Sequence, residues 1–249
     1  MNIIGIIPAR YGSSRFPGKP LADVNGMPMI ERVYRQASKV LDTVIVATDD
    51  KRIYEKVVGF GGKAIMTSAD CPNGTSRVYE AYILSGITAD MVINIQGDEP
   101  YIHPEQIEAV AALLNDDSET QIGTLAHKFD PADGFEALFS PDRVKMTMDL
   151  NGRVLYFSRS IIPYVRSHKW QQWLASATFH THIGLYGFRP DTLRDIISLP
   201  TSPLEEAESL EQLKWLENGY YITAAITPHK SYPVDTPEDL NRINRLNLP

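Results

Sequence analysis

Short apolar runs rich in β-branched residues recur along the first half of the chain, separated by stretches with helical spacing. The runs show little polar alternation, which is typical of strands buried on both faces of a sheet. They are NIIGIIP (2–8), TVIVAT (43–48), KAIM (63–66), DMVINIQ (90–96) and QIGTLA (121–126). Apolar residues at 30, 33, 37 and 40, and at 107, 110, 111 and 114, each follow one helix face. Strands that alternate with helices predict an α/β fold with a mainly parallel sheet.

The pattern changes after about residue 140. RVKMTMDL (143–150) and RVLYFSR (153–159) flank Asn151-Gly152, which predicts a hairpin. The next stretch, 160–180, is irregular and rich in aromatic and basic residues, and HIGLYGF (182–188) predicts another strand. We therefore expect a single domain over residues 1–249, with an inserted β-rich arm at roughly 140–200.

Two helices are predicted near the end of the chain. One covers residues 202–219, with apolar residues at 204, 207, 210 and 213 on one side and Gly219 as its stop. The other begins in VDTPEDLNRINRL (234–246), where Thr236 is the predicted N-cap, Pro237 the first helical residue and Asp239 the third.

Composition and charge narrow the class of protein. The net charge of −7 argues against a general nucleic-acid binder, which would present broad basic surface. A single cysteine, Cys71, excludes an intrachain disulfide and argues against a cysteine-based zinc cluster. No apolar run approaches the roughly 18 residues of a membrane span, and the opening MNIIGIIPAR does not resemble a signal peptide. We expect a cytoplasmic protein with no membrane partner.

The loop after the first predicted strand concentrates positive charge. Within PARYGSSRFPGKPL (8–21) lie Arg10, Arg15 and Lys19, at the sheet edge where open α/β folds bind ligands. Its glycines permit close backbone approach, and Ser13 and Ser14 add hydroxyl donors. A solvated basic turn is the simpler alternative, but the position favours a polyphosphate-binding loop.

Two familiar phosphate loops are excluded by spacing. Gly12 and Gly18 are one residue too far apart for a Walker loop, and Pro20 stands where that loop needs a hydroxyl. The G-x-G-x-x-G dinucleotide fingerprint is absent as well. The loop must therefore hold phosphates in another way.

Carboxylates at two other places can complete a nucleotide site. Asp98 and Glu99 follow a predicted buried strand, and Asp235 precedes a helix, where we also expect a strand end. Mg²⁺ is held by one or two carboxylates together with phosphate oxygens. GDEP (97–100) alone could be an ordinary turn, and Asp235 a cap, although Thr236 already fills that position. We predict that Asp98 and Asp235 converge on one Mg²⁺.

Eight motifs in order now carry a resemblance over nearly the whole chain. They are PARYGSSRFPGKPL, VATDD, NGTSR, NIQGDEP, YFSRSIIP, HIGLYGF, SLEQLKWLENG and VDTPEDL. Together they resemble the 3-deoxy-manno-octulosonate cytidylyltransferases, or CMP-Kdo synthetases. The resemblance implies a Rossmann-like nucleotidyltransferase fold with helices on both sheet faces and an arm used for homodimerisation. It also implies an Mg²⁺-dependent reaction that transfers CMP from CTP to the 2-hydroxyl of Kdo and releases pyrophosphate. The product would serve lipopolysaccharide biosynthesis.

The same resemblance implies roles for particular residues. The CTP phosphates would be held by Ala9, Arg10, Ser13, Ser14, Arg15 and Lys19. The cytosine and ribose would be held by Gly74, Thr75 and Arg77, with Gln96 nearby. The metal would be held by Asp98 and Asp235, which with Arg10, Arg15 and Lys19 form the catalytic group. The sugar acid would be held by Arg159, His182, Tyr186, Glu211 and Gln212.

The sugar-site residues also make chemical sense, because a sugar acid needs a cation for its carboxylate and polar partners for its hydroxyls. His182 and Tyr186 lie on the same face of a predicted strand, which favours a shared pocket. From the residues alone, Arg159 could equally be a surface residue, and His182 could equally be a histidine whose hydrogen bonds are all made within the protein. The acidic helix around Glu211 and Gln212 favours a surface position for these two residues.

Departures from the family pattern concern the acceptor. Ser76, Thr181 and SYP (231–233) differ from it, which leaves 8-amino-Kdo or a sialic-type acid as alternatives, although GDEP favours Kdo over the amino form.

Two other classes of protein are less consistent with the sequence. A sugar 1-phosphate enzyme would show a more glycine-rich first loop, and a nucleotide sensor without catalysis would be expected to lose a metal carboxylate or a loop cation. The aromatic residues Trp170, Trp173 and Phe179 are either a dimer interface or core.

Overall fold

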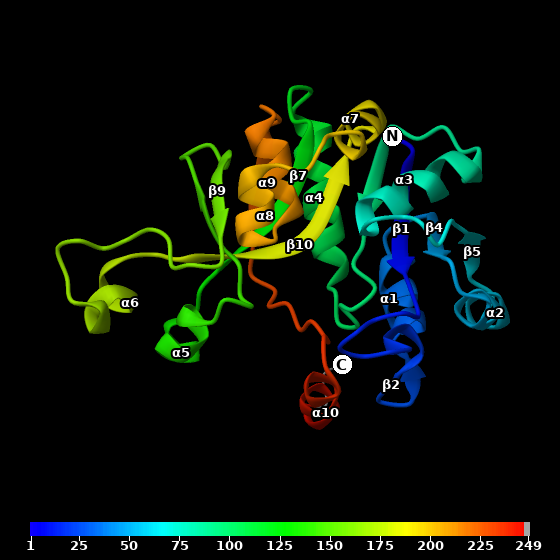
Figure 1. Ribbon diagram of the computed structural model, residues 1–249, viewed down its shortest axis with the longest axis horizontal. Coiled ribbons are helices and arrows are strands. Elements are labelled where there is room, and N and C mark those ends of the chain that lie inside the picture. Colours follow the sequence, from blue (N-terminus) through cyan, green and yellow to red (C-terminus); the bar gives the residue numbers. More distant parts are fainter. Residues whose placement is uncertain (247–249) are drawn as a thin grey trace.

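A mixed sheet forms the centre of the computed structural model, which describes residues 1–246 (Figure 1). The strands are β1 (Ile3–Ala9), β2 (Asp23–Val24), β3 (Met27–Pro28), β4 (Thr43–Thr48), β5 (Lys63–Met66), β6 (Met91–Asn94), β7 (Ile122–Lys128), β8 (Lys145–Met148), β9 (Val154–Ser158), β10 (His180–Phe188) and β11 (Ile222–Thr227). The α-helices are α1 (Met29–Ala37), α2 (Lys51–Gly59), α3 (Gly74–Ser85), α4 (Pro104–Asp116), α5 (Gly134–Phe139), α6 (Trp173–Ser176), α7 (Pro190–Ile197), α8 (Pro203–Glu208), α9 (Glu211–Glu217) and α10 (Pro237–Arg245). Short 3₁₀ turns are η1 (Lys19–Leu21), η2 (Pro131–Asp133) and η3 (Trp170–Gln172).

The strand order is β11-β7-β10-β6-β1-β4-β5. Strands β6, β1, β4 and β5 run parallel to one another, and β11 is parallel to β7. Strand β10 separates these two parallel groups and is antiparallel to both β6 and β7. The predicted α/β fold with a mainly parallel sheet is confirmed, and each predicted strand forms within about three residues of its expected bounds.

Helices cover both faces of the sheet, as expected for parallel strands without polar alternation. One core places Val33 of α1, Ile53 of α2 and Val110 of α4 against the sheet. The core on the other face contains Val78 of α3 and Leu213 of α9. Strand β5 departs from the prediction that it is buried on both faces: it ends the strand order, and its first and last residues are exposed.

The arm begins with the predicted hairpin of β8 and β9, which extends to one side of the molecule in Figure 1. Gly152 turns the chain with φ +84°, and Asp149 Oδ1 accepts the N–H groups of Asn151 and Arg153 at 2.8 and 2.9 Å. Strand β8 also pairs with β10, which lies inside the central sheet. The projecting part of the arm therefore ends before His180, earlier than the expected residue 200.

The aromatic residues of the arm divide between core and surface. Trp173 and Phe179 pack with Phe129 and Leu138 in a small local core. Trp170 remains 47% exposed, and its ring contacts Phe135 and Phe139 edge-on. This separation could not be read from the sequence spacing, which left both interpretations open.

The single helix predicted over 202–219 is wrong, because α8 and α9 are separated at Ser209, which has φ +51°. The Arg159 guanidinium donates to the carbonyl oxygens of Glu208 at 2.6 Å and Ser209 at 3.2 Å. A cation thus satisfies the carbonyl groups that a helix end leaves without partners. Gly219 ends α9 as predicted, with φ +83°.

The last helix begins as predicted. Thr236 caps α10 in a capping box with Asp239, and Pro237 is the first helical residue. The expectation that Asp235 ends a strand is wrong: β11 ends at Thr227, and irregular chain leads from there to α10. Within residues 1–246, no helix is long and apolar enough to cross a lipid bilayer.

Candidate active site

The cation-rich loop leaves β1 at its carboxyl end, as predicted, and closes on itself. The Gly18 N–H donates to the Tyr11 carbonyl at 2.9 Å, and Gly18 has φ +73°. A Cβ on Gly18 would lie 3.0 Å from the Tyr11 ring, so both the turn and the packing require glycine. Ser13 Oγ accepts the Phe16 N–H at 3.3 Å, whereas Arg10 and Ser14 stay exposed. Exposed cations and donors on a closed loop can receive an anion.

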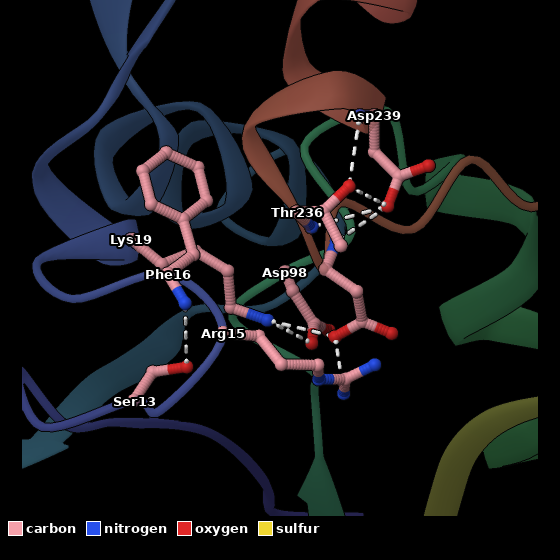
Figure 2. A network of polar contacts seen from close by, with 8 residues as sticks. Ser13, Arg15, Phe16, Lys19, Asp98, Thr236 and Asp239 are labelled. Atoms are coloured by element: carbon pink, nitrogen blue, oxygen red, sulfur yellow. Dashed lines mark hydrogen bonds and ion pairs between the residues drawn. The ribbon is translucent and has the colours of Figure 1, made fainter.

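Three segments distant in sequence meet in an ion-pair network beside this loop (Figure 2). Lys19 Nζ donates to Asp98 Oδ2 at 2.8 Å and to Asp235 Oδ1 at 3.2 Å. Arg15 also donates to Asp235 Oδ1, at 3.0 Å. Burial lowers the pKa of Lys19, but the two carboxylates outweigh it, so that its pKa is raised overall and the ammonium stays charged. Asp98 and Asp235 therefore meet at Lys19 Nζ, and their convergence on one Mg²⁺ stays a prediction.

Asp235 is placed by hydrogen bonds to the 97–100 turn, since it has no strand to hold it. The Val234 N–H donates to the Asp98 carbonyl at 3.0 Å. The Glu99 carboxyl accepts the Ser231 hydroxyl and, at 3.1 Å, the Tyr232 N–H. Glu99 is 9% exposed, and burial raises its pKa to about 8. Sequence reasoning assigned Glu99 no role; its position next to Asp98 was the one available signal.

The residues expected around cytosine and ribose lie at the start of α3. Asn73 caps this helix, and Gly74 packs beside Pro8 at the end of β1. The Thr75 hydroxyl donates to Glu211 at 2.7 Å, which links α3 to α9. The buried Arg77 guanidinium donates to Thr67 at 2.6 Å and to Asp49 at 2.8 Å, so its observed contacts are within the protein.

The surface position that the residues alone favoured for Glu211 and Gln212 is wrong. Gln212 is buried, and Glu211 lies under α3, accepting Asn73 Nδ2 at 2.9 Å as well as the Thr75 hydroxyl. Burial raises the pKa of Glu211. The acidic pattern was misleading because α9 presents its first turn to α3, and only some of the nearby acids face solvent: Glu206 and Glu217 are exposed, whereas Glu208 accepts the Ser158 hydroxyl.

His182 and Tyr186 lie side by side on β10, with ring centroids 5.3 Å apart. The Thr124 hydroxyl donates to the Leu185 carbonyl at 2.9 Å, so its oxygen accepts the His182 Nε2 proton at 3.0 Å and leaves Nδ1 as an acceptor. Among residues 1–246, the buried Tyr186 hydroxyl finds no hydrogen-bond partner. An unpartnered buried hydroxyl near an imidazole nitrogen that can accept suits a ligand rich in hydroxyl groups.

The sugar-site residues border the ion-pair network through Gln96. Its Cγ lies 3.7 Å from the Cβ position of Gly184, between His182 and Tyr186 on β10, and the residue itself lies two positions before Asp98. Arg159 is engaged elsewhere: besides the α8–α9 carbonyls, it donates to the Pro141 carbonyl at 3.0 Å. The observed contacts of Arg159 therefore stabilise the break between α8 and α9.

His182 makes the stability of the protein sensitive to acid. Burial lowers its pKa to about 3 from an ordinary 6.5, so between these values the unfolded chain binds a proton that the folded protein does not. The free energy of unfolding should therefore fall by roughly 2 kcal/mol more between pH 7 and pH 5 than it would without this residue. Urea unfolding at both pH values should show a smaller loss for His182→Gln. The exposed-site control His168→Gln should follow the wild type, and equal losses in all three proteins would contradict the prediction.

The architecture around this site is that of nucleotidyltransferases. A solved cytidylyltransferase from Leptospira borgpetersenii, 16% identical, shares the fold with a TM-score of 0.59 over 98% of this chain and 85% of that one. At this identity the likeness concerns the fold alone.

Closer relatives define the family. A family model described as Cytidylyltransferase matches residues 4–230. The 3-deoxy-manno-octulosonate cytidylyltransferases of Parabacteroides distasonis and Phocaeicola vulgatus are 55% and 53% identical, each over 97% of this chain and 96% of the relative. A solved CMP:2-keto-3-deoxy-manno-octonic acid synthetase, complexed with CTP, is 40% identical, with a TM-score of 0.89 over 99% of this chain and 98% of its own. The chain belongs to the 3-deoxy-manno-octulosonate cytidylyltransferase family and is a nucleotidyltransferase enzyme.

Proposed function

We propose that this enzyme transfers CMP from CTP to the anomeric 2-hydroxyl of Kdo, and that the product serves lipopolysaccharide biosynthesis. The observation that carries the proposal is the meeting of Arg15, Lys19, Asp98 and Asp235 at the carboxyl edge of the sheet. Tyr186 pairs with Asn94 at the carboxyl end of β6, and its buried hydroxyl, which has no hydrogen-bond partner in the described residues 1–246, offers a partner to a sugar. The family relatives bear names with this activity.

Displacement at phosphorus requires charge neutralisation more than covalent help. The 2-hydroxyl oxygen attacks the α-phosphorus while the bond from the α-phosphorus to the β-phosphate oxygen breaks, and the hydroxyl proton passes to solvent water. Arg10, Arg15 and Lys19 lie on the loop that would receive the triphosphate, where they stabilise charge on the departing pyrophosphate. When CTP binds, the Lys19 ammonium donates to a phosphate oxygen in place of one of its hydrogen bonds to the carboxylates.

The Asp98 and Asp235 carboxylates fit Mg²⁺. Both already direct an oxygen at one cation, Lys19 Nζ, within 3.2 Å, and two carboxylates with phosphate oxygens are the donors this ion prefers. Bound there, Mg²⁺ would supply further neutralisation of the phosphates and acidify the attacking hydroxyl. Proton loss to a protein base is not required by this scheme.

The proposal is tested by pyrophosphate release. Purified protein with CTP and Mg²⁺ receives Kdo, 8-amino-Kdo or a sialic acid in separate reactions. We expect release with Kdo. Release only with another acid would keep the cytidylyl transfer and change the acceptor, and silence with every acid from folded, CTP-binding protein would refute the enzymatic proposal.

Glu99 should govern the Mg²⁺ dependence of this reaction through Asp235. Glu99→Ala removes the acceptor of the Ser231 and Tyr232 hydrogen bonds, so the segment before Asp235 loses two of the hydrogen bonds that hold it. We expect the Mg²⁺ concentration at half-maximal rate to rise by about 10–100-fold, the usual effect of an outer-shell partner. Glu99→Gln can still accept the Tyr232 N–H, so its half-maximal Mg²⁺ concentration should stay close to that of the wild type. Equal Mg²⁺ dependence in Glu99→Ala and wild type would contradict the role.

We also propose a homodimer formed through the arm. The aromatic group of Phe135, Phe139 and Trp170 supports it, because Trp170 of the arm and Phe139 at the end of the neighbouring α5 are each about half exposed. Light scattering of the purified protein tests the proposal, and a monomer at micromolar concentration would refute it.

A further inference from the structure

A second group of metal-ligating side chains lies outside the candidate active site. His103 and Glu105 stand at the start of α4, and His229 lies on the segment after β11. His229 Nε2 and Glu105 Oε2 are 2.8 Å apart, and the two imidazole rings stack with centroids at 3.6 Å. Within the described residues 1–246, this is the one group of three or more His, Cys, Asp or Glu side chains whose ligand atoms all lie within 4.8 Å.

The chemistry of these donors points to a particular kind of ion. Imidazole nitrogen and carboxylate oxygen together suit Zn²⁺ and neighbouring divalent metals, whereas Mg²⁺ prefers oxygen donors alone. Glu105 is 67% exposed and His229 27%, so an ion can enter from solvent. The proposed nucleotidyl transfer uses none of the three side chains.

We propose that His103, Glu105 and His229 form a three-ligand site for a Zn²⁺-class divalent metal, with water as the fourth ligand. Tetrahedral ligands at about 2.0–2.1 Å from zinc lie about 3.3 Å from one another, so the ligand atoms close by at most about 1.5 Å. A metal lies in the plane of each imidazole that binds it, so one of the two stacked rings must also turn out of the stack. His229 Nε2 gives up any proton that it shares with Glu105. His103 Nδ1 accepts the Glu105 N–H at 3.3 Å, so binding through Nε2 moves the ring proton to Nδ1 and gives up that long bond.

A metal at this site joins two parts of the chain. His229 lies six residues before Asp235, on the segment that Glu99 holds through Ser231 and Tyr232. The other two ligands belong to the first turn of α4, directly after the 97–100 turn that carries Asp98. The ion would therefore tie the Asp235 segment to α4. This inference goes beyond the proposed function and does not depend on it.

Metal binding can be measured without turnover. The full-length protein, in buffer with excess Mg²⁺ to occupy oxygen-rich sites, is titrated with Co²⁺ and followed by visible absorption, then with Zn²⁺ in competition. His103→Asn keeps a good helix cap and removes the imidazole, and His229→Gln keeps a polar partner for Glu105. His168→Asn, at an exposed histidine of the arm, is the matched control.

We expect one Co²⁺ equivalent with the intense absorption of a four-coordinate site, displaced by Zn²⁺. Each ligand variant should bind at least about tenfold more weakly, by analogy with losses at known sites, and His168→Asn should bind like the wild type. Amide hydrogen exchange in residues 228–235 should slow when the metal binds. Unchanged Co²⁺ binding in both ligand variants, or no binding to the folded wild type, would overturn the site, and unchanged exchange on binding would overturn the tether.

Discussion

Asp98→Asn should lower kcat/KM for CTP by about 10²–10³-fold, since a bound metal stabilises a transition state by several kcal/mol and each 1.36 kcal/mol is tenfold. The amide keeps an oxygen for Lys19, whose ammonium now donates to Asp98 Oδ2 at 2.8 Å, so the fold should remain intact. Pyrophosphate release at increasing Mg²⁺ measures the effect, and the half-maximal Mg²⁺ concentration should rise. Asp235→Asn should behave alike, because both carboxylates share the same cation.

The matched control is Asp116→Asn, at the exposed end of α4, which should retain normal rates. Circular dichroism and urea unfolding confirm that each variant is folded. Near-normal turnover with unchanged Mg²⁺ dependence in Asp98→Asn or Asp235→Asn would remove that residue from the metal site.

Lys19→Met should lower kcat/KM by a similar factor, about 10²–10³-fold, as when one preorganised donor to developing charge is lost. Its effect on Mg²⁺ should be the opposite. Lys19 now occupies both carboxylates, at 2.8 and 3.2 Å, so removing the ammonium removes a competitor and the half-maximal Mg²⁺ concentration should fall. Initial rates over a grid of CTP and Mg²⁺ concentrations separate the two effects.

Lys51→Met, at an exposed lysine of α2, is the control for loss of one positive charge, and it should leave both quantities unchanged. Normal turnover of Lys19→Met would show that Lys19 does not contact the phosphates. A half-maximal Mg²⁺ concentration that rises in this variant would show that Lys19 does not compete for the carboxylates.

The substituted residues Lys19, Asp98 and Asp235 also show why the site was only partly predictable. The loop cations could be located because they follow the first strand, and the place of a strand end in an α/β sheet is fixed by the fold class. The position of Asp235 in the site could not be predicted from local sequence pattern. This residue lies in irregular chain, and hydrogen bonds from Val234 to Asp98 and from Tyr232 to Glu99 bring it there.

The pattern of the sequence by itself determined the elements: the buried strands, the two amphipathic helices, the Asn151-Gly152 hairpin and the Thr236 cap. Each depends on residues within a few positions of one another, so local spacing is sufficient. Tertiary structure alone decided that β10 lies antiparallel between parallel strands, that Arg159 holds a helix break at Ser209, and that Glu211 is half-buried against α3. Those outcomes depend on partners 49 to 136 residues away in the chain, whose pairing is settled by packing and hydrogen bonding rather than by local pattern.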